Sequence, residues 1–166
     1  MHRATRFVGQ LAALQLAISA IAVLAILVTV SMDVVMRAAF NAPFSSTIEI
    51  VSYYYMIPMA FLPLAMLELR GEHIDTELLY NLMPSPVQKL STLVAGMLAC
   101  LIYAVLTYYS FKQAMTSTTA GELAMGVNLL PIWPVRWIMP VAFFMGIIAA
   151  LLLTLQRLFN TGADHE

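Results

Sequence analysis

Ionisable side chains are scarce in this chain, and four long stretches contain no Asp, Glu, Lys, Arg or His at all. Charged residues make up 10% of the 166 residues, against about 25% in soluble domains, while hydrophobic residues make up 61%. The uncharged stretches are 7–32, 50–67, 90–111 and 137–156. Each is long enough to cross about 30 Å of hydrocarbon as a helix. The sequence therefore predicts an all-α integral membrane protein with four transmembrane helices.

Other absences exclude classes of function. Cys100 is the only cysteine, so no intrachain disulfide can form, and the net charge of −1 gives no basic footprint for nucleic acid. The sequence contains no nucleotide-binding loop, no Ser/His/Asp constellation and no cysteine cluster, so we expect neither an enzyme nor a bound cofactor or metal.

Two membrane functions are also disfavoured by what the spans lack. The three histidines, at positions 2, 73 and 165, lie outside the uncharged stretches, which argues against a haem-carrying respiratory anchor. A small autonomous exporter would need a carboxylate inside a span for proton coupling, and the uncharged stretches offer none. We therefore expect a membrane scaffold that works for another polypeptide.

The whole chain, residues 1–166, is interpreted as a single membrane domain with spans at about 9–36, 47–69, 86–111 and 134–158. The first apolar run is longer than the 7–15 residues of a cleavable signal, so it is interpreted as a retained anchor. Four spans place both termini on one side of the membrane. A cytoplasmic location for the termini puts five basic residues inside and three outside, in accord with the positive-inside rule.

The connection between the second and third spans has helical periodicity. Apolar residues recur from Ile74 to Leu82, while Asp75 and Glu77 fall on another face. This pattern predicts a short amphipathic helix over about 75–83 that lies along the inner membrane surface. Because its polar face is acidic, a basic partner protein suits it better than anionic lipid.

Two local polar interactions are predicted at the outer surface. Asp33 and Arg37 are four residues apart at the end of the first span, a spacing that suits an ion pair. Ser46 and Glu49 have the spacing of a capping box at the start of the second span.

The spans themselves carry two packing signals. Pro58 and Pro63 should bend the second span, because each removes a backbone donor. In the fourth span, Ala142, Gly146 and Ala150 place a small residue at every fourth position, which lets another helix approach closely. The pattern does not say whether that helix belongs to this chain or to a partner.

Three patterns, taken in order, resemble a known family. They are Arg37-Ala-Ala-Phe-Asn41 followed by Ile48-Glu49, then Gly71-Glu-His73-Ile, and finally Leu130-Pro131-Ile-Trp133 with Pro140 seven residues after the tryptophan. On four spans in a chain of this length, the succession resembles the small, DctQ-like membrane subunit of tripartite ATP-independent periplasmic (TRAP) transporters over roughly residues 10–158.

The resemblance implies a sodium-driven secondary transporter of the bacterial inner membrane. A soluble periplasmic protein would capture an organic acid and deliver it to a large, DctM-like subunit, which would move it by an elevator motion and carry the sodium coupling. The small subunit would bind and brace the static part of the large one, in contact with membrane lipids. The alternative is a four-helix membrane anchor or assembly subunit of another inner-membrane complex.

Within that picture, nine residues are predicted at partner interfaces. Arg37 and Glu49 would make polar contacts at the outer surface, either with each other or with the large subunit, and Asn41 would shape the same turn. His73, Asp75 and Glu77 would engage the partner on the inner side, and Ala142, Gly146 and Ala150 would offer the close-packing stripe. Lys112 and Glu122, in the second outer connection, would meet the arriving periplasmic protein.

Overall fold

The computed structural model describes residues 2–42, 44–70, 85–124 and 129–160 as an assembly of helices. Its elements are α1 (His2–Phe40), α2 (Thr47–Glu49), the π-helix η1 (Ile50–Tyr55), α3 (Met56–Phe61), α4 (Leu64–Arg70), α6 (Ser85–Ala120), α7 (Trp133–Arg136) and α8 (Ile138–Asn160). Four helical stretches are long and apolar enough to cross a membrane: Arg6–Phe40, Thr47–Arg70, Leu90–Ala120 and Trp133–Gln156. The predicted four-span, all-helical fold is confirmed.

The predicted boundaries differ from the observed ones chiefly at three helix ends. α1 begins at His2, before the predicted 9, and continues to Phe40, beyond the predicted 36. α6 continues to Ala120, beyond the predicted 111. The amphipathic helix expected at 75–83 lies outside the described residues, and so do His73, Asp75 and Glu77.

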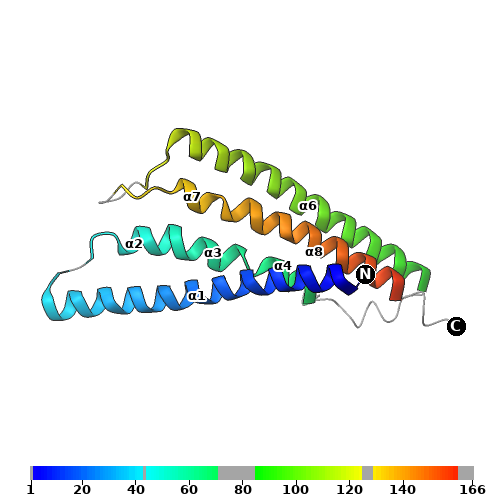
Figure 1. Cartoon of the computed structure of the whole chain (residues 1–166), viewed down its shortest axis with the longest axis horizontal. Coiled ribbons are helices and arrows are strands. Elements are labelled where there is room, and N and C mark those ends of the chain that lie inside the picture. Colours follow the sequence, from blue (N-terminus) through cyan, green and yellow to red (C-terminus); the bar gives the residue numbers. More distant parts are fainter. Residues whose placement is uncertain (1, 43, 71–84, 125–128, 161–166) are drawn as a thin grey trace.

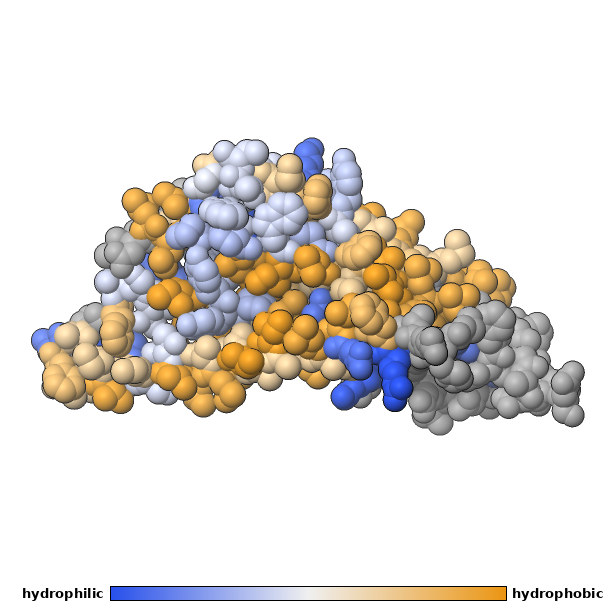
Figure 2. Space-filling model, viewed as in Figure 1, coloured by the Kyte–Doolittle hydropathy of each residue, from blue (hydrophilic) through white to orange (hydrophobic). Residues whose placement is uncertain are grey.

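The helices form two antiparallel pairs that splay apart along the bundle (Figure 1). α1 pairs with the second span, and α6 pairs with α8, the most extensive contact in the described chain. We call the end where α1 begins and α8 ends the terminal end, and the opposite end, with the connections after α1 and α6, the loop end. The face seen in Figure 2 is hydrophobic at its centre and along much of its lower edge, as expected of helices that meet lipid, and it has a more polar area over the upper part of the loop end.

A small core at the terminal end joins three helices. Ala12 of α1 and Ala65 of α4 are fully buried, and they cluster with Val8 of α1 and Met145 of α8. Further along, the rings of Phe61 and Phe143 meet edge to face with their centroids 5.4 Å apart. These contacts hold the two helix pairs together where they converge.

The second span is interrupted, as its prolines predict. The helix breaks at Leu62 and Pro63, between α3 and α4, because Pro63 has no amide hydrogen to donate to the Met59 carbonyl one turn earlier. The hydroxyl of Ser19, on α1, donates to that carbonyl at 3.2 Å instead. A neighbouring helix thus supplies the hydrogen bond that the proline removes.

Pro58 accounts for the π-helix in the same span. In an α-helix its ring would collide with the carbonyl of Tyr54, four residues earlier. η1 ends just before this point, and the Met56 amide donates to the carbonyl of Val51, five residues back. The wider π turn therefore relieves the clash with the proline ring. Pro140 also interrupts its helix: a turn at Trp137, three residues before the proline, separates α7 from α8.

We predict that Ser19→Ala lowers the free energy of unfolding by roughly 0.5–1.5 kcal/mol, because the Met59 carbonyl loses its donor. In a Pro63→Ala background the new amide can replace the hydroxyl, so the same substitution should then cost close to nothing. Denaturation in detergent micelles, analysed as a double-mutant cycle, measures both values. Ser31→Ala is the control, since Ser31 is an exposed residue of the same helix. Equal costs in the two backgrounds would contradict the assignment.

Candidate functional site

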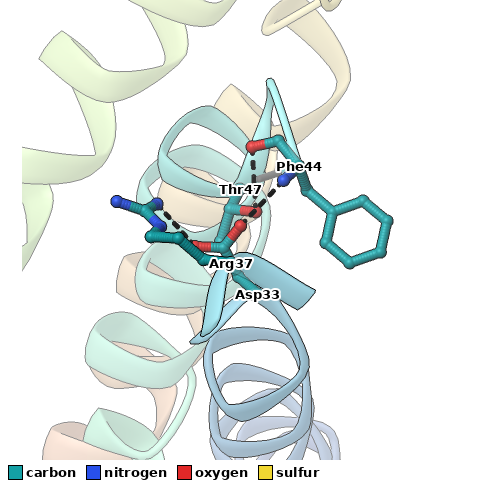
Figure 3. A network of polar contacts seen from close by, with 4 residues as sticks. All are labelled: Asp33, Arg37, Phe44 and Thr47. Carbon is teal, nitrogen blue, oxygen red and sulfur yellow. Dashed lines mark hydrogen bonds and ion pairs between the residues drawn. The ribbon is translucent and has the colours of Figure 1, made fainter. Parts of the chain in front are cut away.

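A carboxylate near the end of α1 organises the connection to the second span (Figure 3). Asp33 Oδ2 accepts a hydrogen bond from Arg37 Nη2 at 2.8 Å, and Asp33 Oδ1 accepts one from the backbone amide of Phe44 at 2.9 Å. The Asp33 side chain is 9% exposed, whereas that of Arg37 is 63% exposed. The network therefore buries one charge, and Arg37 remains on the surface, where another molecule can reach it.

The turn after α1 depends on Asn41. Its φ of 51° lies in the left-handed region, which asparagine tolerates better than most residues and which commonly ends a helix. The Ala42 amide then donates to the Met36 carbonyl at 3.4 Å. Past the turn, Thr47 Oγ1 donates to the Phe44 carbonyl at 3.4 Å. Asn41 thus shapes this turn.

The predicted Asp33–Arg37 ion pair is confirmed, but the Ser46 half of the predicted capping box is wrong. Within the described residues, Ser46 makes no side-chain capping hydrogen bond to α2. The connection is tied by Asp33 and Thr47, which hold Phe44 from either side. Glu49 is the last residue of α2, so it lies at the loop end with Arg37. Whether either residue contacts a partner stays a prediction.

A second polar contact is buried near the terminal end. Glu68 directly follows the second uncharged stretch and falls inside the predicted span 47–69; it lies in α4 and is only 6% exposed. Its Oε2 accepts a hydrogen bond from the Tyr103 hydroxyl of α6 at 3.2 Å. A carboxylate inside the bundle is expensive unless it is paired, and Tyr103 meets part of that need.

The small-residue stripe of α8 packs within the chain. Ala142 and Ala150 are 1% exposed, and a Cβ on Gly146 would lie 2.9 Å from the Tyr103 ring. The close approach that the stripe allows is therefore used by α6 of the same polypeptide. In this arrangement the three residues are covered within the chain, and their predicted place at a partner interface stays a prediction.

The connection from α6 to α7 is held by polar contacts at the loop end. Arg136 of α7 pairs with Glu122, and this hydrogen-bonded guanidinium lowers the pKa of the Glu122 carboxyl below its usual value. The indole of Trp137 donates to Thr118 Oγ1 at 3.1 Å, and Tyr54 of η1 donates to the Pro131 carbonyl. Glu122, predicted to meet a periplasmic protein, thus has an ion-pair partner in its own chain.

Two polar features inside the spans were not predicted from the sequence: the buried side chains of Ser19 and Gln15 in α1, and the partner of Glu68 in α4. Ser19 and Gln15 are one turn apart within the first uncharged stretch, and both are buried. Among the described residues, no hydrogen-bond partner meets Gln15 Oε1. The signal for Ser19 was present, because Pro63 frees a carbonyl that some hydroxyl must satisfy. The pairing of Glu68 carried no such signal, because its partner Tyr103 is 35 residues away in the sequence.

We predict that Asp33→Ala releases the loop that Phe44 occupies. Amide exchange at Phe44 should accelerate about tenfold or more, because its buried acceptor is lost. Asp33→Asn keeps a side-chain oxygen for that amide and should give an intermediate rate. Hydrogen exchange followed by mass spectrometry measures the difference, and circular dichroism checks that helix content is kept. Unaltered exchange at Phe44 in Asp33→Ala would show that the carboxylate does not hold the loop.

We also predict opposite effects for two glycine substitutions. Gly146→Ala should lower the free energy of unfolding by about 1–3 kcal/mol, because its methyl group pushes against the Tyr103 ring. Gly9→Ala should raise it by up to about 1 kcal/mol, because Gly9 is helical and a Cβ there meets nothing within 4 Å. Unfolding in mixed micelles compares the two. A neutral Gly146→Ala would mean that α6 and α8 can separate without cost.

Comparison with known proteins gives one assignment. The family model described as the DctQ component of tripartite ATP-independent periplasmic transporters matches residues 26–160, which is more than half of the chain. No curated protein matches the sequence. The matched region begins in the middle of α1 and ends at the last residue of α8.

Proposed function

Because this chain belongs to the family of DctQ components of TRAP transporters, we propose that it is the fixed scaffold against which a large, DctM-like subunit moves its cargo. The family makes the chain the small membrane subunit of such a transporter. Its scaffolding role, its partners and the nature of the cargo are the proposal.

The observation that carries the proposal is the internal pairing of polar groups along the helices. Ser19 bonds to the Met59 carbonyl, Tyr103 to Glu68, and Arg37 to Asp33. Each pair links separate helices or fixes a helix end. A carrier needs polar groups at membrane depth that bind cargo and release it. These pairs brace the bundle instead, which suits a rigid support.

The transporter proposed here is sodium-driven and takes up an organic acid across the bacterial inner membrane. A soluble periplasmic protein delivers the acid to the large subunit, where the sodium sites also lie. The termini of the small subunit are on the cytoplasmic side, and its loop end faces the periplasm. Arg37, Asn41 and Glu49 are then the residues of the loop end that reach the large subunit or the binding protein.

We predict that Arg37→Ala lowers sodium-driven uptake several-fold while the chain still inserts in the membrane, because the exposed guanidinium is lost from the loop end. Arg37→Lys keeps the charge and should retain most of the uptake. The measurement is accumulation of labelled organic acid in proteoliposomes that contain both membrane subunits, with co-purification of the large subunit as a second readout. Unchanged uptake and unchanged co-purification in Arg37→Ala would remove Arg37 from the interface.

The scaffold itself is tested by reconstituting each subunit separately. Neither subunit alone should give full uptake. Adding the small subunit to proteoliposomes that contain the large one should restore uptake. Solute transport by the small subunit alone, with no companion, would refute the proposed role.

A further inference from the structure

A buried glutamine of α1 needs a hydrogen-bond partner that the described residues do not supply. Gln15 is 8% exposed, and none of those residues bonds to its Oε1. It lies inside the membrane-spanning stretch Arg6–Phe40, where hydrocarbon offers no hydrogen bond either. Burying a carboxamide is costly unless a polar group meets it, so the position calls for a small polar ligand.

The neighbours of this glutamine place it opposite the break in the second span. Four residues further along α1, Ser19 bonds to the Met59 carbonyl. Three residues before the glutamine, Ala12 clusters with Ala65 in the small core at the terminal end. α1 and the second span run antiparallel, so the glutamine lies level with the residue midway between these two contacts (Figure 1). That residue is Leu62, which is 6% exposed and belongs to the turn between α3 and α4.

Ser19 cannot donate the hydrogen bond that Gln15 lacks. Its hydroxyl has one proton, which it donates to the Met59 carbonyl, so only lone pairs remain on its oxygen. Gln15 Oε1 is also an acceptor, and two acceptors do not bond to each other. Ser19 is itself 5% exposed, so both oxygens are shielded from bulk solvent. A ligand between them has to donate two hydrogen bonds.

Water is the ligand that meets this requirement. Side chains four residues apart are neighbours on a helix, with about 5–6 Å between their Cβ atoms, so one water molecule can bridge Gln15 and Ser19. Waters are also commonly bound where a proline interrupts a membrane helix, as Pro63 does here. A metal ion fits less well, because no group of three His, Cys, Asp or Glu side chains forms among the described residues. We propose that an ordered water molecule is bound at the break and donates to Gln15 Oε1 and Ser19 Oγ.

The test is radiolytic labelling of the full chain in lipid nanodiscs. Brief X-ray pulses turn water into hydroxyl radicals, which oxidise only side chains beside a water molecule, so a buried residue is labelled only near a bound one. Leu62 should be labelled in the wild type and should lose the label in Gln15→Leu, which removes one of the two bonding groups. Gln10→Leu is the matched control, because Gln10 is an exposed glutamine of the same helix. It should leave the label at Leu62 unchanged.

A second measurement covers the case in which Gln15→Leu fails to fold. In the wild type in bilayers, with isotope-labelled glutamine, solid-state NMR should show magnetisation transfer from water to the buried carboxamide of Gln15. Absence of this transfer overturns the proposal, and so does a wild-type Leu62 that stays unlabelled. Equal labelling of Leu62 in the wild type and Gln15→Leu would show that bulk water reaches the break without a bound molecule, and would overturn it too.

Discussion

The hydrocarbon core of a membrane offers no hydrogen-bond partner, and the structure of the second span follows from this constraint. Pro63 leaves the carbonyl of Met59 without a donor, so a hydroxyl has to come from elsewhere, and Ser19 provides it. The break then separates α4 from α3, and α4 packs against α8. In α4, Glu68 meets Tyr103, whose ring fits against Gly146. A series of contacts thus leads from the proline break in the second span to the packing of α4, α6 and α8.

The fold could be predicted from the sequence because the spans are defined by what they exclude. Uncharged runs locate the hydrocarbon layer, and all four spans agree with them. The uncharged runs could not give the helix ends, because a run ends at the first charged residue, whereas a helix can continue past it. Asp33 lies inside α1 because Arg37 and the Phe44 amide satisfy its carboxylate. α6 likewise continues past Lys112 to Ala120.

The polar contacts were predictable only where both partners were close in the sequence. The spacing of Asp33 and Arg37 was enough, and so was the proline signal for a bend in the second span. The Ser46 half of the capping box does not form, and the loop is held instead by Asp33, which binds the Phe44 amide from the end of α1. The pairing of Glu68 was not predicted because nothing near it in the sequence points to Tyr103. The stripe of α8 was correctly identified as a close-packing surface, but its partner helix could not be chosen without coordinates.

The length of α1 has a consequence for the chemistry of its far end. At 1.5 Å per residue, its 39 residues measure about 58 Å, nearly twice the thickness of the hydrocarbon layer. Its uncharged stretch ends at residue 32, so the turn at Asn41 lies beyond the hydrocarbon layer, in the headgroup region. There, dissolved ions screen charges that are more than about 8 Å apart at physiological ionic strength. Attraction exerted by Arg37 from that position weakens as salt is added. The bond between Tyr103 and Glu68, shielded by protein, is insulated from the same change.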